Sequence, residues 1–197
     1  YYQSEHTGFS HLYIQKPDEA PIALTSGRFI VDDLTLSHDD NYIYFKANME
    51  HPGLYEVYRA DLTDNTIDTM TDLNGMTDYS LSPDGKNLLL SHSKVNKPQE
   101  LYIKPANETS AAKQITQSTS ADFNALPWAV PNIVAIESSH TEAPIYARVY
   151  LPENYDKSAP NKAVVFNHGA GYLQNAHMGW SWYFREYMFH SMRVQQG

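Results

Sequence analysis

The stretch Leu81-Ser82-Pro83-Asp84-Gly85-Lys86 decides the fold of the first part of the chain, because it recurs. Its counterpart, Leu36-Ser37-His38-Asp39-Asp40-Asn41, lies 45 positions earlier. An Asp-Gly step after a proline, set between two apolar runs, indicates a tight turn between β-strands. A turn that returns at a fixed spacing indicates a repeat architecture.

Two further landmarks return at nearly the same spacing. An apolar residue followed by tyrosine occurs at Leu12-Tyr13, Val57-Tyr58 and Leu101-Tyr102. An apolar residue followed by threonine occurs at Leu24-Thr25, Met70-Thr71 and Ile115-Thr116. A period near 45 residues, with four short strands in each unit, is typical of the blades of a β-propeller. We expect roughly three blades, the first of them partial, and three blades cannot close a ring. The repeats therefore predict the end of a longer propeller.

The apolar runs predict individual strands within and after the repeats. We expect strands at residues 42–48, 54–61, 66–71, 87–93 and 100–104. The repeat ends at residues 125–131, which contain two prolines and predict a linker. Residues 133–136 and 145–151 predict a hairpin. Residues 162–166 then predict a buried strand, and residues from about 179 to 196 show helical spacing.

The break after this last predicted strand is the chemically interesting part of the sequence. It reads Asn167-His168-Gly169-Ala170-Gly171-Tyr172. Small residues let backbone N–H groups approach a ligand closely, as an oxyanion hole requires, and a loop of this composition serves that purpose in lipases and esterases. The candidate oxyanion-hole residues are His168, Gly169, Ala170 and Tyr172. The His168 imidazole could donate to the oxyanion itself or brace the loop while backbone amides act, and Tyr172 is interpreted as a packing residue rather than a catalytic one.

Residues 166–190, FNHGAGYLQNAHMGWSWYFREYMFH, resemble the start of the α/β-hydrolase domain of the prolyl oligopeptidase family of serine peptidases, and in particular its bacterial dipeptidyl peptidase IV-like branch. Residues 4–14, 54–62, 79–104 and 114–128 resemble late propeller blades of the same family. The resemblance implies a chain that is mainly β with an α/β part. Residues 1–125 would be the last blades of a β-propeller, and residues 126–197 the linker and the first strands and helix of a truncated α/β-hydrolase domain.

The resemblance also implies a fragment of a serine peptidase that cleaves short peptides by acyl transfer, as a proline-preferring dipeptidyl peptidase. In such hydrolases the catalytic Ser, Asp and His follow the oxyanion loop, so we expect none of them here and an inactive chain. Paired glutamates grip the substrate's amino end in this family, and no Glu-Glu pair occurs here, so exopeptidase and endopeptidase action stay open. The alternatives are a non-catalytic propeller that binds protein partners and an esterase-type α/β-hydrolase.

Ser181 lies in a stretch that resembles the nucleophile elbow Gly-x-Ser-x-Gly, namely Gly179-Trp180-Ser181-Trp182-Tyr183. The elbow places its serine on a strained turn that requires small neighbours, and Tyr183 would crowd that turn. No strand pattern precedes Gly179. We therefore interpret Ser181 as an ordinary residue in the first turn of the predicted helix.

Composition narrows the classes of partner. The chain carries 23 acidic and 14 basic residues, which argues against nucleic acid as a partner. It has no cysteine and no apolar run near the ~20 residues of a membrane span. The spacing of His168, His177 and His190 suits no metal-ligand pair, so we expect neither metal nor cofactor. We expect a peptide substrate and keep a homo-oligomer open, because unpaired sheet edges favour association. A periplasmic or secreted location is favoured over a cytoplasmic one.

Overall fold

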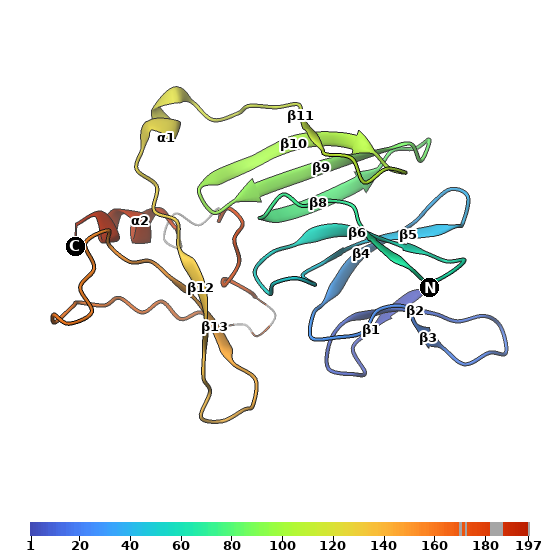
Figure 1. The fold of residues 1–197 in the computed structure, drawn as a ribbon, viewed down its shortest axis with the longest axis horizontal. Helices are drawn as coiled ribbons and strands as arrows, with labels where there is room; N and C mark the ends of the chain where they lie inside the picture. Colours follow the sequence, from blue (N-terminus) through green and yellow to red (C-terminus); the bar gives the residue numbers. More distant parts are fainter. Residues whose placement is uncertain (170, 172, 182–186, 197) are drawn as a thin grey trace.

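The computed structural model describes residues 1–169, 171, 173–181 and 187–196. Three antiparallel sheets stand side by side in chain order, and we call them blades I, II and III (Figure 1). Blade I consists of β1 (Tyr2–Ser4), β2 (His11–Ile14) and β3 (Ile22–Ala23). Blade II consists of β4 (Val31–Leu36), β5 (Tyr42–Ala47), β6 (Glu56–Asp61) and β7 (Ile67–Thr69). Blade III consists of β8 (Met76–Leu81), β9 (Asn87–Lys94), β10 (Lys97–Pro105) and β11 (Lys113–Gln114).

The strands of each blade follow one another in sequence order, each pairing antiparallel with the next. This meander of four strands is the arrangement of a propeller blade. The five strands predicted inside the repeats are all present, with ends that differ by at most three residues. The predicted partial first blade is also confirmed, because blade I has three strands where blades II and III have four.

The same turn recurs in blades II and III, and in both it is stabilised by side-chain hydrogen bonds. In blade III, the Ser82 hydroxyl donates to Asp84 at 2.6 Å and accepts from the backbone N–H of Asn87 at 3.0 Å. Gly85 has a φ of +69°, a left-handed conformation that glycine adopts without strain. The turn at residues 36–41 of blade II repeats both bonds. The sequence motif therefore recurs once per blade, because blades II and III each contain one such hydrogen-bonded turn.

Apolar cores fill the spaces between neighbouring blades. The core between blades I and II contains Leu12, Leu24, Phe29, Val31, Ile43, Phe45, Ala47, Tyr58 and Ala60. The core between blades II and III contains Tyr44, Val57, Met70, Leu88, Leu90 and Ala106. Blades I and II thus each bury one face against the blade that follows, which is how stacked blades acquire a common core.

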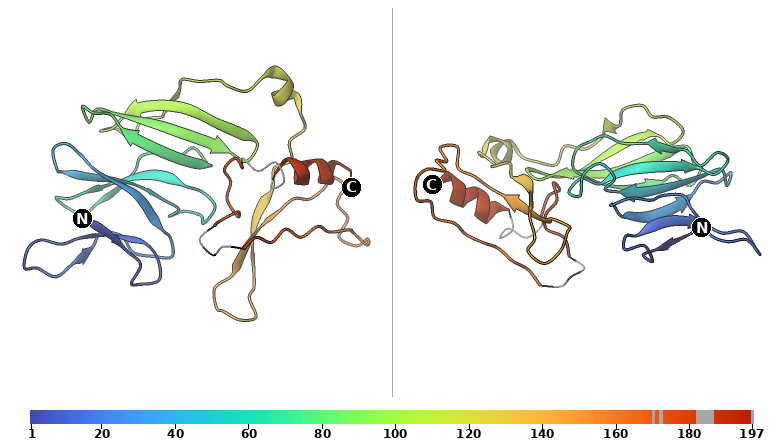
Figure 2. Two further views of the ribbon diagram at one scale, coloured as in Figure 1. Left: turned by 180° about the vertical axis from the view of Figure 1, so that it is seen from behind. Right: turned by 60° about the horizontal axis from the view of Figure 1, so that its bottom comes forward.

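The rest of the chain lies beside the blades (Figure 2). It contains α1 (Ala121–Ala125), the hairpin of β12 (Asn132–Ile136) and β13 (Ile145–Val149), and α2 (Met188–Gln195). A third apolar cluster joins these parts to blade III. Its buried members are Val95, Trp180 and Tyr187, and Phe123, Trp128, Tyr150 and Met178 pack against them. The predicted hairpin is present. No helix of the described residues is long and apolar enough to cross a membrane.

Two predictions about the last part of the chain were wrong. Residues 162–166 form no strand, and Val165 is 87% exposed, because no strand among the described residues lies where they could pair with it. The predicted helix over 179–196 is present only as α2 within the described residues. Ser181 is buried in irregular backbone rather than in a first helical turn, and the preceding Trp180 N–H donates to the Ser93 hydroxyl of blade III at 3.1 Å.

Candidate functional site

The described residues of the glycine-containing loop at 167–172 are His168, Gly169, Gly171 and the preceding Asn167. The His168 Nδ1–H donates to the carbonyl of Gly169 at 2.6 Å, so the ring turns back onto its own loop. A Cβ built on Gly169 or on Gly171 would meet nothing within 4 Å. Ala170 and Tyr172, the other two candidate oxyanion-hole residues, lie outside the described residues. The oxyanion-hole assignment of all four residues stays a prediction.

The segment that follows this loop is fixed against blade II. The buried hydroxyl of Tyr55 donates to the Gln174 side-chain oxygen at 2.5 Å, and the Gln174 side-chain N–H donates to the carbonyl of Pro52 at 2.7 Å. Within the bend at residues 176–179, the Met178 N–H donates to the carbonyl of Gly53 at 2.8 Å. The loop at residues 51–55, which joins β5 to β6, therefore holds residues 174–178 at three points.

Two glycines allow this close approach. A Cβ on Gly53 would lie 2.1 Å from Ile133 Cδ1 and 3.1 Å from the carbonyl oxygen of Ala176. A Cβ on Gly179 would lie 2.6 Å from the Cβ of Met76, at the start of β8. The space at Gly179 is too small for any side chain, so its backbone packs directly on blade III, and the bare Gly53 lets Ile133 and the Ala176 carbonyl approach the blade II loop closely.

The hairpin supports the same segment from the other side. The Arg148 guanidinium, on β13, donates to the carbonyl of His177, while the His177 Nδ1 accepts from the Gly179 N–H at 3.1 Å. His190 instead stacks on Tyr150, with ring centroids 5.5 Å apart. The three histidines weighed as metal ligands are thus not brought together, and the described residues contain no cluster of metal-ligating side chains.

Sequence reasoning missed a polar network between blades II and III. The Glu56 carboxylate accepts from the hydroxyls of Thr71 at 2.5 Å and of Thr77 at 3.3 Å, and Thr77 bonds to His92 Nδ1 at 3.0 Å. Burial, with smaller contributions from Lys94 and Lys97, lowers the pKa of His92 to about 4, so its ring is neutral near pH 7. Thr71 belongs to the repeated apolar–Thr landmark, and this repeat was the sequence signal from which the network could have been predicted. Its hydroxyl accepts from the Val57 N–H at 2.9 Å, as Thr25 and Thr116 accept in the other blades.

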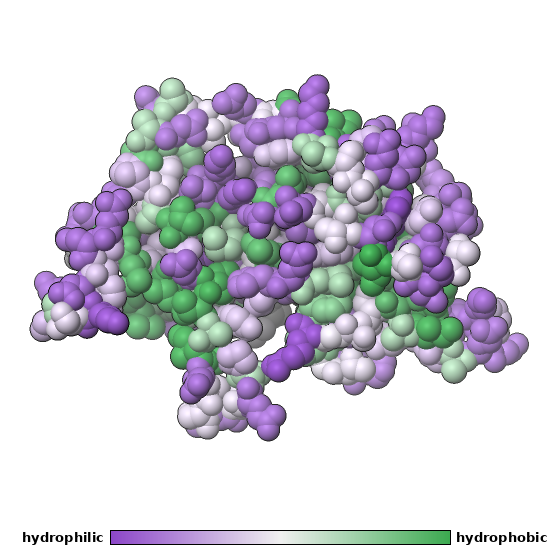
Figure 3. Space-filling view, in the orientation of Figure 1, coloured by the Kyte–Doolittle hydropathy of each residue, from purple (hydrophilic) through white to green (hydrophobic). Residues whose placement is uncertain are grey.

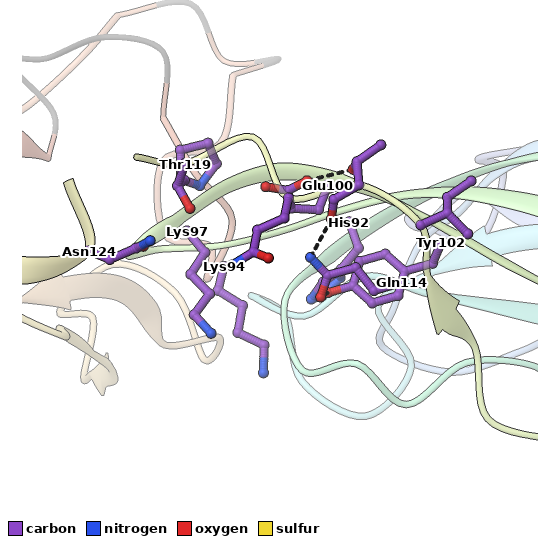
Figure 4. Close-up of a pocket in the computed structure, with 12 residues that line it drawn as sticks. His92, Lys94, Lys97, Glu100, Tyr102, Gln114, Thr119 and Asn124 are labelled. Atoms are coloured by element: carbon purple, nitrogen blue, oxygen red, sulfur yellow. Dashed lines mark hydrogen bonds between the residues drawn. The ribbon is translucent and has the colours of Figure 1, made fainter. Parts of the chain in front are cut away.

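A polar hollow of about 890 Å³ lies on blade III beside β11. Its lining includes His92, Lys94, Lys97, Glu100, Tyr102 and Gln114 (Figure 4). Both Glu100 oxygens are occupied, one by Thr116 and the other by the N–H and hydroxyl of Ser118. Because the Glu100 carboxylate is fully engaged in this way, we assign the candidate site to the loop and its anchored segment rather than to the hollow.

Comparison with known proteins identifies the family of this chain. A family model described as the N-terminal region of dipeptidyl peptidase IV matches residues 1–99. A probable dipeptidyl-aminopeptidase B of Podospora anserina is 36% identical over 109 residues, which are 52% of this chain and 12% of that protein. The crystal structure of Porphyromonas gingivalis dipeptidyl peptidase 4 superposes with a TM-score of 0.72 at 17% identity, over the whole of this chain and 27% of the other.

These relatives are several times longer than this chain, and the likeness to the bacterial structure at that identity concerns the fold alone. The family model matches residues 1–99, within the part of the chain where the sequence also indicates blades. The bacterial structure, in contrast, matches this chain from end to end, the hairpin and the anchored segment included. Because the family model covers half of the chain and the fungal relative agrees with it, this chain belongs to the dipeptidyl peptidase IV family.

Proposed function

We propose that this chain is part of a serine peptidase that releases dipeptides from short peptides, with a preference for proline at the second position. In this proposal residues 1–125 are the last blades of the propeller, and residues 126–197 begin the α/β-hydrolase domain. The catalytic serine, aspartate and histidine lie in a part of the protein that follows this chain. The chain itself supplies backbone or side-chain donors to the oxyanion, from His168, Gly169, Ala170 or Tyr172.

One observation carries the proposal. The loop with oxyanion-hole composition leads, within a few residues, into a segment seated on the edge of blades II and III. In this proposal the loop lies at the boundary between the repeats and the domain that follows them. A site at such a boundary is reached only past the blades, which favours short peptides over folded proteins or bulky esters.

The exposed apolar surface of the hairpin and the segment after it supports a further domain. Apolar side chains gather on this side of the molecule (Figure 3). The exposed residues there are Val134, Ile136, Ile145, Tyr146, Val164, Val165 and Phe166. A contiguous apolar surface of this kind marks an interface. In the proposal this surface is covered by the remaining strands and helices of the hydrolase domain.

The test is labelling with a fluorophosphonate serine probe, on this chain and on the intact protein side by side. We expect labelling of the intact protein only, together with release of the chromophore from a dipeptidyl substrate that ends in proline. Labelling of this chain at Ser181 would show that the nucleophile has been misplaced. An intact protein that is labelled but cleaves only simple esters would favour an esterase. Labelling of neither would favour a non-catalytic propeller module.

A further inference from the structure

In the described residues, the loop that carries the candidate oxyanion donors is braced by the His168–Gly169 hydrogen bond but makes no hydrogen bond to the blades. Gly169 and Gly171 have open space around them, and Phe166 before the loop is half exposed in unpaired backbone. An oxyanion donor, however, must be held within a few tenths of an ångström of its working position. Something outside the loop must therefore fix it.

The nearest fixed point on the carboxyl side is the Gln174 side chain. Its oxygen accepts from Tyr55 at 2.5 Å and its nitrogen donates to Pro52 at 2.7 Å. These two partners determine the amide orientation, because a carbonyl such as that of Pro52 only accepts. Burial raises the pKa of Tyr55, so its hydroxyl keeps the proton that it donates.

Tyr55 is itself held rigidly. It is 5% exposed, and its backbone N–H and carbonyl bond to Gly75 at 2.9 Å and Thr77 at 3.0 Å, across the seam between blades II and III. Gln174, in contrast, is an exposed residue on irregular backbone. The rigid partner in this contact is therefore the blade and the positioned partner is the segment that follows the loop.

We propose that Tyr55 and Gln174 form a positioning pair, through which the propeller fixes the carboxyl side of the oxyanion loop. The inference rests on the proposed function and adds a role for the blade edge in the chemical step. Neither residue touches substrate. Their effect passes through the position of the loop, so it falls on the stabilisation of the transition state and not on the binding of the substrate.

The experiment compares Tyr55→Phe and Gln174→Ala with the wild type in the intact protein. The matched control is Tyr102→Phe, which loses a hydroxyl bond to Gln114 on blade III at 3.3 Å. We expect kcat to fall about 10-fold in both test variants with KM unchanged, since small displacements of a catalytic donor have effects of this size or larger. Affinity for a dipeptide boronic acid, which becomes tetrahedral on the serine, should fall in parallel, and affinity for the product dipeptide should not. The control should match the wild type.

A second measurement separates this inference from the proposed function. Hydrogen exchange of peptides covering residues 173–180 can be followed in this chain without any activity. We expect Tyr55→Phe to accelerate their exchange about fivefold, the effect of losing one hydrogen bond, and Tyr102→Phe to leave it unchanged. Unchanged kcat in an active protein would overturn the positioning pair, and so would unchanged exchange. An inactive intact protein would refute the peptidase, and the exchange result would then decide whether the pair holds the segment.

Discussion

Blades II and III carry the same sequence landmarks but bury them differently. Val57 on blade II is fully buried, whereas its counterpart Leu101 on blade III is 38% exposed. Met70 on blade II is 2% exposed, and its counterpart Ile115 is 49% exposed. The difference arises because blade III covers the face of blade II, while no described residue covers the same face of blade III. Burial at these positions is therefore a property of the neighbouring blade and not of the strand.

The hydrogen bonds inside each blade do not differ in this way. The hydroxyl of Thr71 joins Glu56 to the Val57 N–H, and that of Thr116 joins Glu100 to the Leu101 N–H, with closely similar distances. These bonds connect groups within one sheet, so they form with or without a neighbour. Each blade thus has an internal part, the hydrogen bonds within its sheet, which its own sequence specifies. It also has an external part, the apolar face, which is buried only when the next blade covers it.

The largest expected effect on stability comes from making the same Leu→Ala substitution in blade I, whose face is covered by blade II, and in blade III, whose equivalent face is exposed. Leu12 holds the position of Leu101 in blade I, and it is fully buried in the core against blade II. We expect Leu12→Ala to lower the free energy of unfolding by about 2–5 kcal/mol, because it leaves a cavity. Leu101→Ala should cost less than about 1 kcal/mol, since its side chain is already hydrated.

Urea unfolding followed by circular dichroism measures both effects. The measurement should be repeated at several protein concentrations, since the exposed face of blade III could pair with another molecule. A large cost for Leu101→Ala that grows with protein concentration would show that association covers this face. A large cost at every concentration would contradict the comparison outright.

An intermediate effect comes from His92, whose position in blade II is occupied by Ala47. The two residues pair with Glu100 and Glu56 respectively, so they are structurally equivalent. The pKa of His92 is about 4 in the folded chain, below the ordinary value of 6.5. The unfolded state then binds the proton first as pH falls, so stability is lost between about pH 6.5 and 4, on the order of 3 kcal/mol.

His92→Ala, which places the blade II residue in blade III, isolates this contribution. Carboxylates that titrate in the same range are common to both proteins and cancel in the difference. We expect the unfolding free energy of the wild type to fall more steeply than that of the variant when the pH is lowered from 7.5 to 4.5. Parallel pH profiles would mean that His92 is hydrated when folded.

The sequence predicted the strands and turns inside each blade correctly. It did not predict features that depend on a neighbouring element, such as the exposure of a side chain. Strands, turns and the partial first blade follow from spacing, because Ser82, Thr71 and their counterparts act locally. The exposure of Ile115 could not be predicted, since its apolar signal equals that of Met70. The strand expected at residues 162–166 failed for the same reason, because an apolar run becomes a strand only beside a partner. The anchoring of Gln174 on Tyr55 joins residues 119 positions apart and has no local signal.

The smallest expected effect tests whether the internal part of a blade really is independent of its neighbour. Thr71→Val and Thr116→Val remove the same hydroxyl from equivalent positions. We expect Thr71→Val to cost about 1–2 kcal/mol, because Glu56 and the Val57 N–H lose a buried partner. Thr116→Val should cost less than about 1 kcal/mol, since Thr116 is half buried and water can replace the hydroxyl. Equal costs in urea unfolding would mean that the bond, and not its burial, sets the energy. In that case blade III would be as well formed as blade II, and its open face would be a surface ready to receive another blade.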